Sequence, residues 1–215
     1  MVEVLDVAIG NILKTIDDEG IRDNTVVLFF SDNGGGAGAD NGEFRGRKGL
    51  VYEGGTRLPA VIRWPGKIPS NVKSEQQMVV YDLFPTFVDA LGLPTKLNTP
   101  FDGESVWDVL QSGKARARKT DMVIGNAHSY AVHSGEYKFV HSNINESQEA
   151  DSELIELFKL YDDPYETTNV ADKYPKVVKT LLDKSTFAAD WVSKAPSQPA
   201  RGNRGQGGGD RVGPG

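Results

Sequence analysis

The segment Thr25-Val26-Val27-Leu28-Phe29-Phe30, followed directly by Ser31-Asp32-Asn33-Gly34-Gly35, decides the fold prediction. Its first part is an unbroken run of β-branched, apolar and aromatic residues, whereas a strand with one wet face alternates apolar and polar residues. The run therefore predicts a strand buried on both faces, and buried parallel strands belong to α/β folds. The second part places polar side chains at the carboxyl end of that strand.

The residues before this strand predict an amphipathic helix. Apolar residues recur three and four positions apart from Leu5 to Ile16, which is the spacing of one helix face. Gly20 is expected to cap the end of this helix. A helix that leads into a buried strand agrees with the α/β fold class.

The residues after the strand predict a long loop and then a return to regular structure. Residues 31–55 are polar and rich in glycine, which is typical of a loop that carries function rather than packing. The elements expected beyond this loop are a strand over residues 57–64, helices over 81–91, 105–110 and 174–191, and short strands over 130–140 and 157–161 around a hairpin turn at Ser134-Gly135.

These patterns divide the chain into three parts. Residues 1–112 are expected to form an α/β core, residues 120–195 a smaller α+β subdomain, and residues 196–215 a flexible glycine-rich tail. Residues 113–119 are basic and are interpreted as a linker between the first two parts.

The composition excludes several classes of function. The 215 residues carry a net charge of −6 and are 38% hydrophobic, which is typical of a globular protein with no general attraction to nucleic acid. No apolar run approaches the roughly 18–20 residues that cross a bilayer. Because the chain contains no cysteine, it can form no disulfide, thiolate metal site or cysteine nucleophile of its own.

Asp32 and Asn33 are the candidate metal ligands. In open α/β sheets, sites form beyond the carboxyl ends of the strands, which is where these two residues are expected. A carboxylate beside an amide oxygen suits a hard cation such as Ca²⁺ or Mg²⁺. The alternative is that the Asp-Asn-Gly-Gly sequence is only a turn, and spacing alone leaves both interpretations open.

A cationic cluster, Phe44-Arg45-Gly46-Arg47-Lys48-Gly49, follows the proposed metal ligands in the same loop. Arginine and lysine held near a metal would bind a tetrahedral oxyanion, as in a sulfate or phosphate ester. The alternative is a solvated basic loop. The next cluster, Glu53-Gly54-Gly55-Thr56-Arg57, is interpreted as a structural turn with an internal Glu–Arg pair.

Several motifs together resemble the carboxyl-terminal half of a type I sulfatase, with an order of elements similar to that of arylsulfatase B. The resemblance covers roughly residues 1–190. The motifs that carry it, in chain order, are Thr25 to Gly35, Phe44-Arg45-Gly46-Arg47-Lys48-Gly49, Glu53-Gly54-Gly55-Thr56-Arg57-Leu58-Pro59-Ala60, Trp64-Pro65-Gly66-Lys67-Ile68-Pro69, Asp82-Leu83-Phe84-Pro85-Thr86-Phe87, Phe101-Asp102-Gly103-Glu104-Ser105, and Leu160-Tyr161-Asp162 with Asp163-Pro164-Tyr165-Glu166-Thr167-Thr168-Asn169.

The resemblance implies an alkaline phosphatase-like sulfatase fold with an incomplete central sheet, in which residues 1–112 are the distal part of the catalytic domain. It also implies hydrolysis of sulfate esters, with Asp32 and Asn33 as Ca²⁺ ligands and Lys48 in contact with the substrate sulfate. The implied substrate is a sulfated small molecule or glycan, and the implied location is secreted, lysosomal or periplasmic.

The sequence departs from the family pattern at the nucleophile. The family uses a formylglycine made from cysteine in a C-x-P/A-x-R motif, and this chain has neither the cysteine nor the motif. We therefore expect the chain alone to be inactive and to bind Ca²⁺ weakly. We also expect exposed edges and apolar faces at the strand Thr25–Phe30, and hence poor solubility. His128, His133 and His141 are expected at surface or hairpin positions, without a catalytic role.

Two alternatives to the sulfatase hypothesis stay open. In the first alternative, the chain is a non-catalytic domain derived from a sulfatase. In the second, it is part of a phosphate or phosphonate ester hydrolase of the same superfamily. Asn33 argues against the second alternative, because relatives that use zinc or manganese often have histidine after that aspartate.

Overall fold

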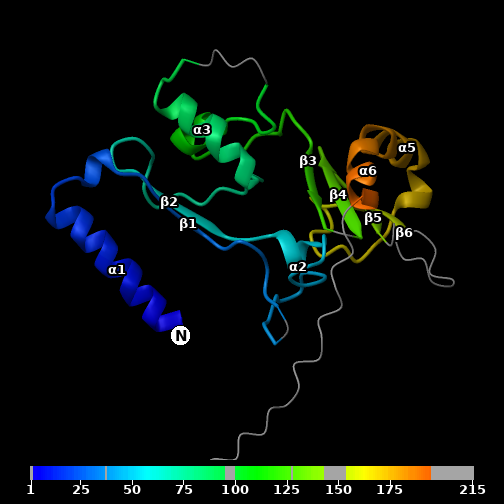
Figure 1. Cartoon of the computed structure of the whole chain (residues 1–215), viewed down its shortest axis with the longest axis horizontal. Helices are drawn as coiled ribbons and strands as arrows, with labels where there is room; N and C mark the ends of the chain where they lie inside the picture. The colour runs from blue at the N-terminus through cyan, green and yellow to red at the C-terminus, as the bar shows by residue number, and fades with distance from the viewer. Residues whose placement is uncertain (1, 37, 95–99, 127, 143–153, 195–215) are drawn as a thin grey trace, which may run out of the picture.

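The computed structural model describes residues 2–36, 38–94, 100–126, 128–142 and 154–194 (Figure 1). The predicted tail, residues 196–215, lies outside the described residues. Within the described residues, no helix combines the length and the apolar composition needed to cross a membrane.

Helix α1 (Val2–Asp18) forms the first element, as its apolar spacing predicts. Gly20 ends it with a φ of 67°, and the Gly20 N–H donates a hydrogen bond to the Asp17 carbonyl oxygen at 3.2 Å. The predicted glycine cap is therefore confirmed. Helix α1 has no buried residue, and Figure 1 shows it at one end of the molecule, next to the strands that follow.

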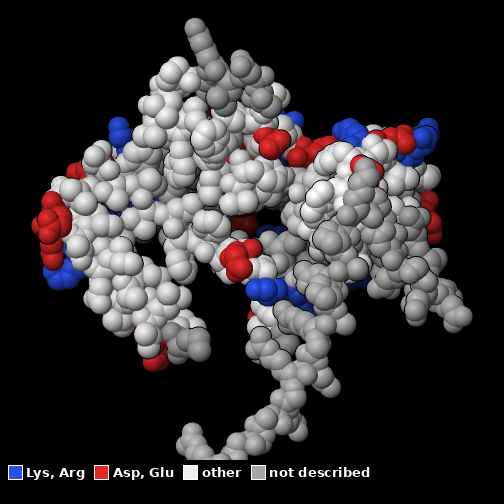
Figure 2. Space-filling model, in the orientation of Figure 1, with Lys and Arg blue, Asp and Glu red and all other residues white. Residues whose placement is uncertain are grey.

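Strand β1 (Val27–Phe30) pairs with β2 (Ala60–Arg63) in an antiparallel two-stranded sheet. The prediction of a strand is confirmed, but the prediction that both of its faces are buried is wrong, since Phe29 is 47% and Phe30 41% exposed. The reason is that no helix packs extensively over β1 in the described residues, where β2 is also its only paired strand. Figure 2 shows a broad uncharged surface over α1 and this two-stranded sheet.

Two short helices complete the first part of the chain, and hydrogen bonds through Thr86 join them. The Thr86 hydroxyl donates to the Asp82 carbonyl oxygen at 2.6 Å and accepts from the Val106 N–H at 3.1 Å. The Trp64 and Trp107 rings, 5.8 Å apart, pack α4 close to the end of β2. The elements here are η2 (Val80–Asp82), α3 (Leu83–Ala90) and α4 (Trp107–Ser112).

The second part contains a four-stranded antiparallel sheet with its strands in chain order, β3-β4-β5-β6. The predicted hairpin turn joins β4 to β5, where Gly135 has a φ of 59°. The sequence patterns predicted three of these strands and missed β3. The strands are β3 (Met122–Gly125), β4 (Ser129–Ser134), β5 (Tyr137–Ser142) and β6 (Leu154–Lys159).

One face of this sheet is covered by helices α5 (Pro175–Lys184) and α6 (Thr186–Lys194) (Figure 1). The sequence predicts a single helix here, and the structure has two. Ser185 separates them, because its buried hydroxyl bonds the Leu181 carbonyl oxygen at 2.7 Å and lies 3.0 Å from the Tyr130 hydroxyl. The core on this side consists of Tyr130, Val132, Phe139, Leu157, Leu181, Ala188 and Val192.

The opposite face of the sheet is covered by the first part of the chain. Val51 and Tyr52, from the loop after β1, pack against this face. Side chains alternate between the two faces of a strand, so Lys138 and Val140 of β5 face the loop while Phe139 faces the helices. The sheet thus holds the loop in which the sequence places the candidate site. The sheet residues in this second cluster are Ala131, Val140, Phe158 and, just beyond β6, Leu160.

Candidate functional site

The predicted site residues lie just beyond β1. The Asp32 side chain is 82% exposed, and the Lys48 ammonium nitrogen lies 3.9 Å from Asp32 Oδ2. Asn33 is half-buried, and its carbonyl oxygen accepts a hydrogen bond from the Ser31 hydroxyl at 3.0 Å. Figure 2 shows acidic and basic side chains next to one another where the two-stranded sheet reaches α2. The structure therefore brings Asp32 and Lys48 together.

Main-chain hydrogen bonds hold the two sides of this loop together. The Lys48 N–H donates to the Gly35 carbonyl oxygen at 3.0 Å, and the Gly34 N–H donates to the Gly55 carbonyl oxygen at 2.9 Å. The Asn41 side chain accepts from the Gly35 N–H at 2.8 Å and donates to the Gly35 carbonyl oxygen at 3.2 Å. The main chain of Lys48 is thus held next to that of Gly35, three residues after Asp32.

Helix α2 (Glu53–Thr56) lies at the centre of the loop, and its glycines are required by close backbone contact. A Cβ atom on Gly54 would lie 2.5–2.7 Å from three main-chain carbonyl oxygens, those of residues 44–46. A Cβ atom on Gly34 would collide with the Gly54 carbonyl oxygen. The Glu-Gly-Gly sequence is therefore what allows α2 to sit between the two sides of the loop.

A buried ion-pair cluster joins α2 to the four-stranded sheet. The Lys138 ammonium on β5 lies 2.8 Å from Glu53 Oε1 and 2.7 Å from Glu166 Oε1. Glu166 Oε2 also accepts a hydrogen bond from the Glu53 N–H at 2.7 Å. All three residues are at most 3% exposed. Burial raises the pKa of Glu166, and the charge of Lys138 opposes that shift.

A second anchor joins the loop to β6. The Arg45 guanidinium donates to Glu156 Oε1 at 2.8 Å, and the Tyr52 hydroxyl donates to Glu156 Oε2 at 2.5 Å. The guanidinium also lies over the Tyr52 ring, 4.0 Å from its centroid. Burial, together with the hydrogen bond to Glu156, raises the pKa of Tyr52 to about 12. Arg45 of the predicted cationic cluster therefore has structural partners.

Comparison with known proteins matches residues 1–93 to the sulfatase family. A sulfatase of Formosa agariphila is 32% identical over 214 residues, which cover 90% of this chain and 39% of that protein. Human arylsulfatase A is 32% identical over 232 residues, which cover 92% of this chain and 45% of that protein. The chain belongs to the sulfatase family. It spans about two fifths of the length of these relatives.

The fold of this sulfatase chain is also found in solved structures. The structure of BT4656 in complex with its substrate D-glucosamine-2-N,6-O-disulfate aligns with a TM-score of 0.68 and 24% identity, covering 90% of this chain and 41% of that one. This likeness supports the predicted α/β sulfatase fold with a partial sheet.

The Asp163-to-Asn169 motif of this sulfatase chain has a structural explanation. The Asp163 carboxylate accepts hydrogen bonds from the main-chain N–H groups of Thr167 and Thr168, at 3.1 and 2.9 Å. Asn169 accepts from the Leu157 N–H of β6 at 3.0 Å. Between these two anchors, Glu166 adopts a left-handed φ of 58°, so that the loop directs its carboxylate to the buried cluster.

The histidines occupy surface and hairpin positions, as predicted, but the two on the hairpin are buried. His128 is exposed, whereas His133 is 8% and His141 5% exposed, on the two strands of the hairpin. His133 lies 3.9 Å from Glu53, and neither of its ring nitrogens has a hydrogen-bond partner in the described part of the chain. Burial, and then the positive charge of Lys138, lowers its pKa well below the usual value.

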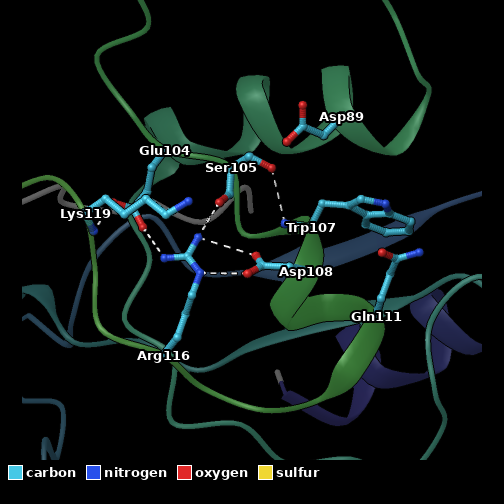
Figure 3. Close-up of a pocket in the computed structure, with 8 residues that line it drawn as sticks. All are labelled: Asp89, Glu104, Ser105, Trp107, Asp108, Gln111, Arg116 and Lys119. Atoms are coloured by element: carbon cyan, nitrogen blue, oxygen red, sulfur yellow. Dashed lines mark hydrogen bonds and ion pairs between the residues drawn. The ribbon is translucent and has the colours of Figure 1, made fainter.

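The segment predicted as a basic linker, residues 113–119, is tied to the first part of the chain. Arg116 donates to Glu104 at 2.7 Å and to Asp108 at 2.8 Å (Figure 3). Burial alone would raise the pKa of Glu104, but these and neighbouring hydrogen bonds lower it. This network forms one wall of an open pocket of about 440 Å³, where Trp107 lies opposite Arg116 (Figure 3). Arg116 thus serves as an ion-pair partner for the first part of the chain.

Sequence reasoning predicted the exposed residues of the site and missed the buried ones. The predicted Glu–Arg pair is present, with Arg57 lying 3.4 Å from Glu53 Oε2, but Lys138 was not recognised as the other partner of Glu53. Lys138 stands between Tyr137 and Phe139 in a strand, a position that alternation assigns to the wet face. In the described residues, no group of three or more His, Cys, Asp or Glu side chains is arranged to hold a metal ion.

Proposed function

We propose that this sulfatase chain contributes the calcium-binding and sulfate-binding residues of a sulfuric ester hydrolase. The observation that carries the proposal is the 3.9 Å separation between the Lys48 ammonium and the Asp32 carboxylate at the carboxyl end of β1. The Lys48 ammonium and a cation bound by Asp32 would then face the same small anion. This pairing of charges is suited to a doubly negative or delocalised oxyanion.

The donor set supports Ca²⁺ as the metal. Asp32 offers a carboxylate and Asn33 an amide oxygen, both hard ligands, and the chain has no cysteine to favour a softer metal. When bound, the ion would supply positive charge that polarises the sulfate oxygens. Because Ca²⁺ takes six to eight oxygen ligands, two side chains alone would bind it weakly, and we propose that residues outside this chain complete the site.

Lys48 is proposed to contact the sulfate group. An ammonium group is a compact point charge with three N–H donors, and the Lys48 side chain is 57% exposed, so it is accessible to a ligand. Its backbone is fixed by the hydrogen bond to Gly35. Lys48 would therefore orient the sulfate and stabilise negative charge on its oxygens as the ester bond breaks.

The nucleophile is proposed to come from outside this chain. A formylglycine made from cysteine cannot form here, since the sequence has no cysteine. We therefore propose that the 215-residue chain alone does not turn over substrate. This proposal agrees with the share of the relatives that the chain spans, about two fifths.

A sulfated glycan is the proposed substrate class, and an extracytoplasmic location, secreted, lysosomal or periplasmic, is proposed by analogy with the family. The solved structure of BT4656, which shares the fold of this chain, contains its substrate, a disulfated glucosamine. This supports a sulfated sugar as the proposed substrate class. The exposed position of Asp32 and Lys48 is compatible with a large ligand.

The test of the proposed function uses the native polypeptide that carries this segment, with a chromogenic aryl sulfate as substrate. Lys48→Ala is expected to lower kcat/KM by about 10²-fold or more, as for the loss of a group that stabilises developing charge. Lys67→Ala, in an exposed turn, is the matched control and should leave kcat/KM unchanged. Equal activity of the Lys48 variant and its control would overturn the role of Lys48.

The metal site is tested separately, by titrating Ca²⁺ into the same polypeptide and following the heat of binding. Asp32→Asn is expected to weaken Ca²⁺ binding, whereas Glu43→Gln, which removes an exposed carboxylate from the same loop, should not. Unchanged Ca²⁺ affinity in the Asp32 variant would refute the assignment. Preferential hydrolysis of an aryl phosphate over the aryl sulfate would favour the phosphate-ester alternative.

A further inference from the structure

We propose that Lys138 is a positioning residue for the candidate site: together with Glu53 and Glu166 it fixes helix α2, and through α2 it fixes the loop that presents Asp32 and Lys48. The proposal extends the proposed function, on which its catalytic consequence rests. It assigns to the four-stranded sheet, which carries none of the predicted site residues, the task of setting the geometry of the site.

The first step is the position of the Lys138 charge. Its side chain is fully buried and its ammonium contacts two carboxylates, Glu53 at 2.8 Å and Glu166 at 2.7 Å. Arg57 adds a second positive charge 3.4 Å from Glu53, so that two cations balance two carboxylates. Removal of Lys138 would leave a buried carboxylate without compensation, which is costly. The cluster therefore holds α2 against the sheet in one arrangement.

The second step is the connection from this cluster to the site. The Glu53 N–H is bound by Glu166, and the following residue, Gly54, donates its N–H to the Arg45 carbonyl oxygen at 2.6 Å. The carbonyl oxygen of Gly55 then accepts from the N–H of Gly34, which directly follows Asn33. A short chain of main-chain bonds thus links the buried cluster to the predicted ligands.

The same series of main-chain hydrogen bonds reaches the side of the loop that carries Lys48, the proposed sulfate contact. Lys48 donates its N–H to the carbonyl oxygen of Gly35, the residue after Gly34. Gly34 and Gly54 have no space for a side chain between them, so a shift of α2 displaces Gly34 directly. The position of Asp32 relative to Lys48 is therefore coupled to the position of α2.

The backbone conformation of Glu166 is a separate argument for a specific role. A glutamate with a φ of 58° is held in a left-handed conformation that costs of the order of 1 kcal/mol or more for a residue with a side chain. A buried ion pair is moreover rarely better for stability than apolar packing of the same volume. The arrangement is better explained by the precise placement of α2 than by stability alone.

The test measures amide hydrogen exchange in the full chain, comparing wild type with Lys138→Met. We expect exchange at Gly34, Lys48 and Gly54 to become about tenfold faster or more, while the amides in the β4–β5 ladder change less than about twofold. Lys159→Met is the matched control, because Lys159 is on the same sheet but pairs with the exposed Glu136 at 3.0 Å. It should leave the loop amides unchanged.

Two results would overturn the proposal. One is unchanged exchange at Gly34, Lys48 and Gly54 in the Lys138 variant. The other is acceleration of the ladder amides to the same extent, which would show a general loss of stability. If Lys138→Met does not fold, Glu166→Gln replaces it, because this variant keeps Lys138 paired with Glu53. A few-fold acceleration at the same three amides is then expected, and no change refutes the proposal.

Activity provides the second measurement and separates the two proposals. In the native polypeptide that carries this segment, Lys138→Met is expected to lower kcat for aryl sulfate hydrolysis by about tenfold or more with a smaller change in KM, and Lys159→Met to leave both unchanged. If exchange responds as expected but the wild-type polypeptide hydrolyses no sulfate ester, the proposed function fails and the positioning role stands. If the wild type is active and exchange does not respond, the positioning role fails.

Discussion

Asp82 and Arg118 form a two-pronged ion pair between the first part of the chain and the segment that leads into the four-stranded sheet. The guanidinium nitrogens lie 2.6 and 3.0 Å from the two carboxylate oxygens. Asp82 is fully buried, and the Arg118 side chain is 7% exposed. The same carboxylate accepts hydrogen bonds from the N–H groups of Val79 and Glu104, both at 2.9 Å. All four lone pairs of the two carboxylate oxygens therefore have a donor.

Replacement of Arg118 by methionine should therefore be strongly destabilising. The change leaves the Asp82 carboxylate buried without its counter-charge, and the expected loss in the free energy of unfolding is about 3–5 kcal/mol. Urea unfolding of the full chain followed by circular dichroism measures this loss.

The control for this change is Arg22→Met. Arg22 and Asp23 form an exposed pair at 3.9 Å, and an exposed pair contributes at most about 1 kcal/mol. Comparable losses in the two variants would show that Arg118 has no special role.

The Tyr52 hydroxyl provides a spectroscopic test of the second anchor. Because the pKa of Tyr52 is raised to about 12 by burial and by Glu156, its phenolate should appear about two pH units above that of an ordinary tyrosine. Ultraviolet titration of wild type against Tyr52→Phe isolates this component. In Glu156→Gln the component should move to lower pH.

The sign of the linked stability change follows from the same shift. Between pH 10 and the folded pKa, the unfolded chain loses the Tyr52 proton while the folded chain keeps it. The stability contribution of Tyr52 is therefore complete below about pH 10 and is lost as the pH rises toward the folded pKa. A Tyr52 phenolate that titrates with the ordinary tyrosines would contradict the assigned hydrogen bond.

Local sequence signals predicted the parts of the fold that depend on local chemistry. The Gly20 cap and the Gly135 turn need a positive φ, which the residue type reveals. The exposure of β1 was predicted only through the family resemblance, because the apolar run itself indicates what a strand requires and not which neighbours are present. Strand β3 was missed because it is only four residues long, Met122–Gly125, and has no clear alternation.

The buried half of the site was hidden for a different reason. A lysine in a strand is normally assigned to the wet face, and Lys138 contradicts this only because Glu53 and Glu166, far away in the sequence, converge on it. The same holds for Arg118, whose partner Asp82 lies in another part of the chain. Pairing between distant charges is a tertiary property that a single sequence does not display.

Alanine substitutions at Gly54 and Gly10 should have opposite effects on the stability of the chain. Gly54→Ala places a Cβ atom 2.5–2.7 Å from three backbone carbonyl oxygens and should destabilise the chain, by about 1–3 kcal/mol if the loop can shift. Gly10→Ala, in the middle of α1 with no atom within 4 Å of the new Cβ, should stabilise it by about 0.5–1 kcal/mol.

Thermal and urea unfolding of the two glycine variants measure both signs. The two changes add the same single methyl group, so each serves as the control for the other. An equal effect at the two positions would show that contact around α2 does not limit the size of residue 54.

His133 predicts a pH dependence of stability. Its pKa in the folded chain is lowered well below the usual value, first by burial and then by Lys138, Arg118 and Arg57. As the pH falls below about 6.5, the unfolded chain takes up a proton at this position and the folded chain does not. The free energy of unfolding should then decrease by about 1.4 kcal/mol per pH unit from this residue alone.

His133→Gln isolates this contribution, because it removes the titrating group and retains a neutral polar side chain. Carboxylates elsewhere titrate equally in both proteins and cancel in the difference. The variant should be the less stable protein at pH 8, where the packing of the imidazole is lost, and should gain on wild type as the pH falls below about 6.5. His128→Gln, at an exposed position, should follow wild type at every pH. Parallel curves of unfolding free energy against pH for wild type and the His133 variant would contradict this prediction. They would mean that His133 is protonated equally in the folded and unfolded chains, although burial beside the Lys138 ammonium disfavours the charged ring.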